Sequence, residues 1–139
     1  MRRLWGFLAA VIGTYTLAVA AASQYVANRL VEMNVEVSLI QRLEWWLHDL
    51  LGMGKSLLPL VAVGLLIGIA VADWLAKKWP RGRTGLLVLA GFVALITIHI
   101  ALKLSLGLHP VPSTRFIAGL LIQGLAGAFG GWLYWRLNP

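Results

Sequence analysis

Four long apolar segments constrain this chain more than any other feature of its sequence. They cover residues 4–27, 57–76, 85–106 and 116–135. An α-helix needs about 20 apolar residues to cross the hydrocarbon core of a bilayer. We therefore expect a single all-α domain over residues 1–139, built as an integral membrane four-helix bundle.

The composition supports a membrane protein over a soluble one. The chain is 60% hydrophobic and only 12% charged, whereas soluble domains carry roughly 25% charged residues. The net charge of +7 does not indicate nucleic-acid binding, because the basic residues lie at the ends of the apolar segments and form no basic face. The chain contains no cysteine, which excludes disulfides and thiolate metal ligands. Membrane lipids are the expected surroundings.

The first apolar segment has an alternative interpretation as a secretory signal. Arg2 and Arg3 precede it, and three alanines at residues 20–22 resemble a cleavage site. Signal cores are typically 7–15 residues long, and this segment is longer. We expect it to be retained as a transmembrane helix.

The distribution of Lys and Arg predicts the orientation in the membrane. Seven of them lie at the N-terminus, in the 77–84 loop and at the C-terminus. The other five face the opposite side, where four acidic residues dilute them. By the positive-inside rule, both termini and the 77–84 loop should be cytoplasmic. Five tryptophans fall at this inner boundary, as an aromatic belt requires: Trp5, Trp74, Trp79, Trp132 and Trp135.

The segment between the first two apolar runs is predicted to hold two short elements. Apolar and polar residues alternate over 31–38, which is typical of an extended strand. Ser38 and Gln41 then have the spacing of a capping box. Apolar residues follow at helical spacing, which predicts an amphipathic helix over 39–51. We expect it to lie on the outer membrane surface with Trp45 and Trp46 at headgroup level, or to pack over the mouth of the bundle, and the two are compatible.

Small residues at intervals of four indicate close helix packing. They let two backbones approach, and a glutamine between them can hydrogen-bond across the interface. The same spacing serves packing within one chain or homo-oligomerisation, and the sequence leaves both open. The positions are Gly64 and Gly68 in the second segment, and Gly119, Gln123, Gly127 and Gly131 in the fourth.

The ionisable residues on the predicted outer side are the candidate site. An ionisable group within a span usually faces protein or water and is a functional hypothesis by default. His99 is the strongest case, whereas Lys103 is near enough to its helix end to reach the interface. The candidates for ligand or proton handling are His99, Asp49, Arg115, Lys103, His48, His109 and Gln123.

Three interpretations of these outer residues remain. The first is a pocket that handles a proton or ligand through His99, Asp49 and Arg115. The second is a metal site, but the histidines occur one per element and match no ligand spacing, so we predict no metal and no cofactor. The third is a structural network in which Asp49 compensates Arg115, a cation that the helix dipole disfavours in the first turn of the last helix.

The sequence contains no motif of an enzyme. It lacks a phosphate-binding glycine loop, a serine elbow and a pair of intramembrane carboxylates. At the predicted inner end, Asp73 and Lys77 have the spacing of an ordinary helical ion pair. A non-enzymatic role is the expectation.

Two glycine-rich stretches carry a resemblance to a known group of proteins. Residues 46–52 (WLHDLLG) and 119–127 (GLLIQGLAG), followed by Gly130, Gly131 and Trp132, resemble a family of small, uncharacterised four-helix bacterial inner-membrane proteins. The resemblance implies a bacterial inner-membrane location and no known activity. The expected function is an accessory subunit of a larger membrane complex, or a self-associating helical bundle. The alternative is a small transporter or a ligand- or lipid-binding protein with an outward-facing polar pocket.

Overall fold

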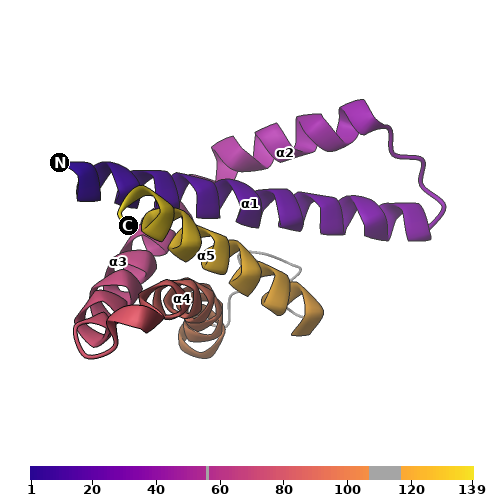
Figure 1. The fold of residues 1–139 in the computed structure, drawn as a ribbon. Coiled ribbons are helices and arrows are strands. Elements are labelled where there is room, and N and C mark those ends of the chain that lie inside the picture. The colour runs from indigo at the N-terminus through magenta and orange to yellow at the C-terminus, as the bar shows by residue number, and fades with distance from the viewer. Residues whose placement is uncertain (56, 107–116) are drawn as a thin grey trace.

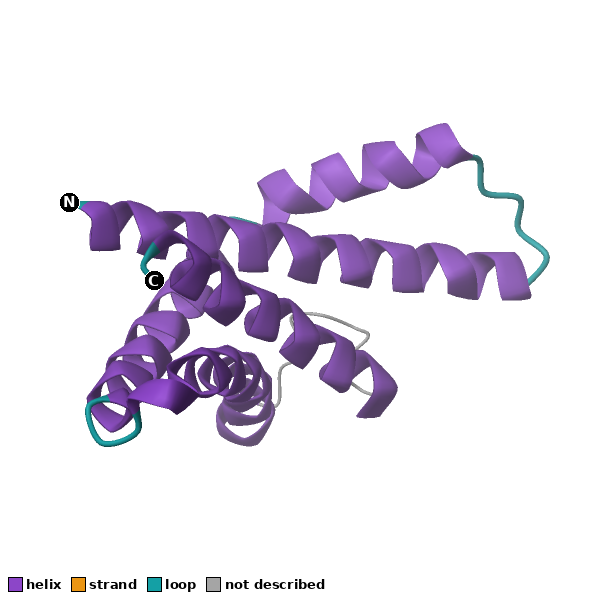
Figure 2. Cartoon of the chain, viewed as in Figure 1, coloured by secondary structure: helices purple, strands orange, loops and turns teal. Residues whose placement is uncertain are grey.

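The computed structural model describes residues 1–55, 57–106 and 117–139. This part of the chain is helical throughout, with turns between the helices and no strand (Figures 1 and 2). The elements are α1 (Arg2–Glu32), α2 (Leu39–Met53), α3 (Leu57–Ala76), the 3-10 turn η1 (Pro80–Gly82), α4 (Arg83–Leu106) and α5 (Ile117–Leu137).

The strand expected near residues 31–38 is wrong. Helix α1 continues to Glu32 and ends in a Schellman motif, in which Asn34 takes a left-handed conformation with φ of 63°. The amide of Val35 donates to the carbonyl of Leu30, and the amide of Asn34 donates to that of Val31. Helix α1 satisfies the backbone groups of residues 31 and 32 internally, whereas an isolated strand would have no neighbouring strand to pair with.

The helices form two antiparallel pairs that cross at an angle. In Figure 1, α5 runs back along α1, and α3 and α4 form a hairpin; α1 is drawn along its length while α4 is viewed nearly end-on. Helix α5 joins the two pairs, because it packs on α4 as well as on α1. The structure therefore confirms an all-helical fold. The helices are not near-parallel to one another.

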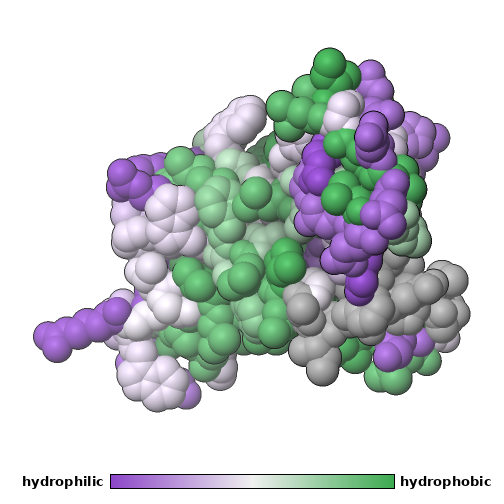
Figure 3. All heavy atoms as spheres, turned by 90° about the vertical axis from the view of Figure 1, so that its right-hand side faces the viewer, coloured by the Kyte–Doolittle hydropathy of each residue, from purple (hydrophilic) through white to green (hydrophobic). Residues whose placement is uncertain are grey.

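Three helical segments are long and apolar enough to cross a membrane, judged by length and composition within the described residues. They are α1, α3 and the continuous segment Pro80–Ser105 formed by η1 and α4. Large apolar side chains on them are exposed, as with Ile12 at 61% and Ile67 at 60%. Figure 3 shows a continuous hydrophobic area on one face, flanked by hydrophilic side chains on both sides.

Glycines set the distance between α4 and α5. A Cβ atom added at Gly91 would lie 2.7 Å from the carbonyl carbon of Gly127 and 3.2 Å from the amide nitrogen of Gly131. A Cβ atom added at Gly131 would lie 2.7 Å from the carbonyl carbon of Leu87. The two backbones are therefore in direct contact, which only residues without a side chain permit.

Candidate functional site

Helix α2 presents three different faces, and one of them packs along α1. Its N-terminus carries the expected capping box, in which Ser38 and Gln41 each bond the other's backbone amide. An apolar stripe is exposed, with Leu39 at 82% and Leu51 at 83%. Polar residues cover the second exposed face. The third face, toward α1, holds half-buried side chains of both kinds: Arg42, Trp45, Trp46, Asp49 and Leu50.

Hydrogen bonds join this third face to α1, and we call them the α1–α2 polar seam. Ser23 Oγ donates to Asp49 Oδ2 at 2.5 Å. Arg42 Nη1 donates to Gln24 Oε1 at 2.7 Å and to Asn28 Oδ1 at 3.1 Å. The polar outer end of α1 is thus paired with the polar side of α2.

A backbone acceptor continues this contact toward the middle of α1. The hydroxyl of Tyr15, itself 7% exposed, donates to the carbonyl oxygen of Leu50 near the end of α2. The indole ring of Trp46 packs against the hydrophobic core between these bonds. The α1–α2 contact therefore combines apolar burial with polar pairing, which fixes the position of α2 along α1.

Arg115, the expected partner of Asp49, lies outside the described residues, and so does His109. Asp49 accepts a hydrogen bond from Ser23. His48 lies on the exposed polar face of α2, and Lys103 is exposed in the last turn of α4, where a cation favourably faces the helix dipole.

His99 is buried in α4, at 3% exposure. It follows Leu87, Gly91 and Leu95 at intervals of four, and these three positions face α5. In this antiparallel packing, Leu87 lies beside Gly131 and Gly91 beside Gly127, so His99 lies further along the face of α4 that packs on α5. Gly119, in the first turn of α5, is also buried.

Gln123 links α5 to α1 inside the fold. It is fully buried, and its Nε2 donates to the carbonyl oxygen of Ala18 at 2.9 Å. Its Oε1 accepts no hydrogen bond from any residue that the structure describes, and neither does the buried hydroxyl of Thr14. The bond to Ala18 fixes the position of α5 along α1, so this glutamine specifies the pairing of the two helices.

A second polar group, which we call the end junction, joins four helices and was missed by sequence reasoning. Arg83 Nε pairs with Asp73 Oδ1 at 3.0 Å, and Arg83 Nη1 donates to the carbonyl oxygen of Asn138 at 2.6 Å. Arg2 Nε donates to the carbonyl oxygen of Leu137 at 3.0 Å. Two arginines from other helices therefore cap the C-terminal carbonyls of α5, where the helix dipole favours positive charge.

The expected ion pair between Asp73 and Lys77 is wrong. Helix α3 ends at Ala76, so Lys77 is beyond the helical geometry that would bring the two side chains together. Arg83, the first residue of α4, lies across a short turn from the end of α3 and pairs with Asp73 in place of Lys77. The signal available in the sequence was the placement of Asp73 and Arg83 on either side of that turn.

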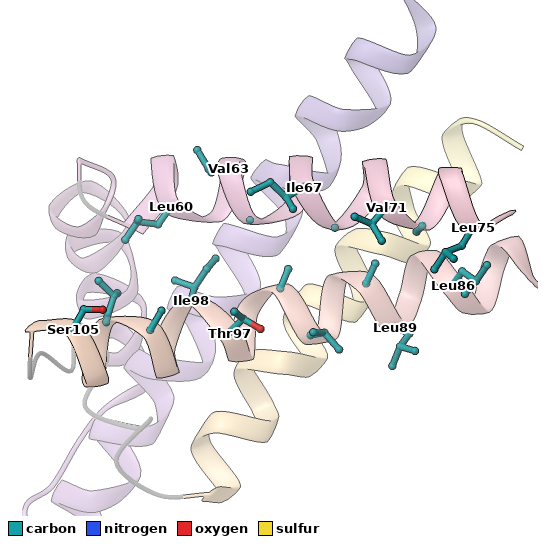
Figure 4. Close-up of a pocket in the computed structure, with 18 residues that line it drawn as sticks. Leu60, Val63, Ile67, Val71, Leu75, Leu86, Leu89, Thr97, Ile98 and Ser105 are labelled. Atoms are coloured by element: carbon teal, nitrogen blue, oxygen red, sulfur yellow. The ribbon is translucent and has the colours of Figure 1, made fainter. Parts of the chain in front are cut away.

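A groove runs along the outer surface of the α3–α4 hairpin (Figure 4). It has a volume of about 620 Å³ and is lined only by residues of these two helices. The small residues Gly64, Gly68 and Ala94 contribute to its lining. His99 and Asp49 do not line it. The groove is therefore a feature separate from the α1–α2 polar seam.

The glycines expected in helix packing lie at contacts within the chain. A Cβ atom at Gly64 would meet Ile98, and one at Gly68 would lie 3.1 Å from the carbonyl oxygen of Ala90. Gly127 and Gly131 face α4, as described above. Gly91, their counterpart in α4, was not singled out from the sequence, although its spacing of four from Leu87 and Leu95 was visible.

Within residues 1–55, 57–106 and 117–139, no three His, Cys, Asp or Glu side chains are grouped so that they could hold a metal ion. The polar groups of the α1–α2 polar seam and of the end junction are paired with one another or with backbone carbonyls. Such an arrangement can hold helices in register.

Comparisons with known proteins give no family for this chain. No protein-family model matches it, no curated protein matches it, and no solved structure matches it.

Proposed function

We propose that this chain is a small, non-enzymatic protein of the bacterial inner membrane, acting as an accessory subunit or as a self-associating helical bundle. It crosses the membrane four times, with α1, α3, α4 and α5 as spans and both termini in the cytoplasm. The observation that carries the proposal is the sorting of its surface. Large apolar side chains are exposed along α1, α3 and α4, while the charged side chains of these three helices lie near their ends.

Three features support the four-span topology. The N-terminus, the α3–α4 turn and the C-terminus meet at the end junction, through Arg2, Arg83 and Asn138. Helix α5 packs along both α1 and α4, so it shares their depth in the membrane. The end junction lies where Lys and Arg are most dense, which the positive-inside rule assigns to the cytoplasm.

The proposed role in association follows from how the polar groups are used. Arg83 and Arg42 bind other parts of the same chain, so these groups hold the fold together. Apolar helix faces remain for contact with lipid or with another protein, among them the exposed stripe of α2 through Leu39 and Leu51. In a membrane, such faces associate by close packing of helices.

Single-cysteine labelling tests the topology, because the natural chain has no cysteine to give background. Gly82→Cys reports the α3–α4 turn, where nothing lies within 4 Å of an added Cβ atom. Glu44→Cys reports the exposed polar face of α2. A membrane-impermeant maleimide added outside intact cells should label Glu44→Cys, and it should label Gly82→Cys only after permeabilisation. The opposite pattern would refute the orientation.

Native mass spectrometry of the protein purified from its membrane tests the association. A mass that is a multiple of the chain supports self-association, and a stable complex with a different protein supports the accessory role. A monomer at all concentrations, with no co-purifying protein, would contradict both.

The α3–α4 groove favours a second function, the binding of a membrane lipid. It is apolar and does not include His99 or Asp49, so it supports lipid binding and lends nothing to a transport pathway.

A further inference from the structure

The α3–α4 groove has the length and the lining to hold an acyl chain. Its lining runs along α3 from Leu60 to Leu75, which at 1.5 Å per residue is roughly 22 Å. One leaflet of the hydrocarbon core is about 15 Å deep, half of roughly 30 Å. Figure 4 shows Leu60 and Ser105 at one end of the groove and Leu75 and Leu86 at the other. An acyl chain that enters at either end of the groove therefore contacts apolar side chains over the full depth of one leaflet.

Charge distinguishes the two ends of the groove. Beyond Leu75, the chain continues into Lys77, Lys78 and Arg81, all of which are exposed. The described residues supply no carboxylate partner for these three, because the ion pairs found are Arg83 with Asp73 and Arg29 with Glu32.

One of these cations is held in place by an aromatic ring. The Nζ atom of Lys78 lies 5.2 Å from the ring centroid of Trp74. Trp74 and Trp79 are themselves 58% and 63% exposed, as aromatic residues are at headgroup level. The opposite end of the groove has two exposed cations near it among the described residues, Lys55 just before α3 and Lys103 in the last turn of α4.

We infer that the groove binds one acyl chain of an anionic phospholipid from the cytoplasmic leaflet, with the phosphate held by Lys77, Lys78 and Arg81. Basic residues on the cytoplasmic side of membrane helices attract anionic headgroups by about 1 kcal/mol per Lys or Arg. The positive charge of these three side chains selects an anionic headgroup, and the groove holds the acyl chain below it. This inference rests on the proposed membrane topology, in which the α3–α4 turn is cytoplasmic.

The test measures lipid binding to the delipidated full chain in detergent by native mass spectrometry. The probes are phosphatidylglycerol and phosphatidylcholine with the same acyl chains. We expect phosphatidylglycerol to bind more tightly. The double variant Lys77→Gln/Arg81→Gln should weaken phosphatidylglycerol about 10- to 30-fold, since two cations are lost, and should leave phosphatidylcholine unchanged. The matched control Arg3→Gln/Arg136→Gln removes two exposed charges elsewhere and should keep the preference.

A second pair of variants tests the groove itself. Thr97→Phe fills the groove in its middle, where Thr97 lies (Figure 4), and should weaken both lipids. Ile100→Phe adds the same ring on α4 at a 42% exposed position that does not line the groove, and should leave both unchanged.

Several results would overturn the inference. They are equal binding of the two lipids, a preference that survives in Lys77→Gln/Arg81→Gln, and unchanged binding in Thr97→Phe. A dimer that excludes lipid and dissociates in Thr97→Phe would identify a second copy of the chain as the occupant instead. Labelling of Gly82→Cys from outside intact cells would refute the topology itself. Cytoplasmic labelling without lipid selectivity would refute only the lipid site.

Discussion

Replacement of Gly91 by alanine should destabilise the fold, because it forces α4 and α5 apart. The added Cβ atom would lie 2.7 Å from the carbonyl carbon of Gly127, and closer to its oxygen. Real Cβ atoms essentially never approach other heavy atoms within 3.0 Å. No rotamer change relieves the overlap, since the obstructing atoms belong to the backbone.

The expected magnitude follows from two opposing terms. Overpacking a well-packed contact costs about 1–3 kcal/mol. Alanine is favoured over glycine within a helix by about 1 kcal/mol, which partly hides that cost. Gly85→Ala is the control, because Gly85 is in the same helix and nothing lies within 4 Å of its added Cβ atom. The difference between the two variants should therefore isolate the overlap, at about 1–3 kcal/mol.

The assay is unfolding of the purified protein in detergent, followed by helical circular dichroism. Gly91→Ala should unfold at lower temperature than Gly85→Ala, and the double variant Gly91→Ala/Gly127→Ala should lose less than the sum of the two single losses. Subadditivity is expected because the first substitution already separates the backbones. Equal stability of Gly91→Ala and Gly85→Ala would refute the direct backbone contact.

Three further predictions concern the polar contacts. Ser23→Ala should cost about 1 kcal/mol, because it removes a half-buried hydrogen bond to Asp49, and faster hydrogen exchange in α2 should report it; unchanged exchange would count against the seam. A double-mutant cycle of Asp73→Ala and Arg83→Ala should give a coupling energy of about 0.5–3 kcal/mol in unfolding, whereas zero coupling would contradict the end junction. Gln123→Met should be less destabilising than Gln123→Ala in the same unfolding measurement. Met fills the volume and removes an oxygen with no partner among the described residues, whereas Ala leaves a cavity that costs about 2 kcal/mol or more. The reverse order would contradict this account of Gln123.

Local sequence patterns predicted the elements that depend on local physics. The capping box of Ser38 and Gln41 marked the start of α2 correctly, because both bonds join residues three apart. The predicted strand failed for a related reason. Apolar and polar residues alternate over 31–38, but this pattern does not supply a neighbouring strand with which the segment could pair. Helix α1 instead continued on its own backbone hydrogen bonds until Asn34 turned the chain.

Contacts between distant residues were not readable from spacing. Asp73 was assigned to Lys77 on helical periodicity, but the choice of Arg83 depended on where α3 ended and how α4 began. The outer polar residues were grouped by predicted side of the membrane. The structure joined Asp49 to Ser23 and buried His99 on the α5 side of α4, whereas Arg115 and His109 are outside the described residues.

From the amino-acid sequence alone it follows that this protein is helical, with apolar segments as long as a membrane is thick. Both properties follow from composition and periodicity over a few turns, which no distant residue needs to support. Tertiary structure alone decided which face of α2 meets α1, that Gly91 faces Gly127, and that the α3–α4 surface is grooved. These depend on the register between helices, and register is set by the sum of many weak contacts across the whole fold.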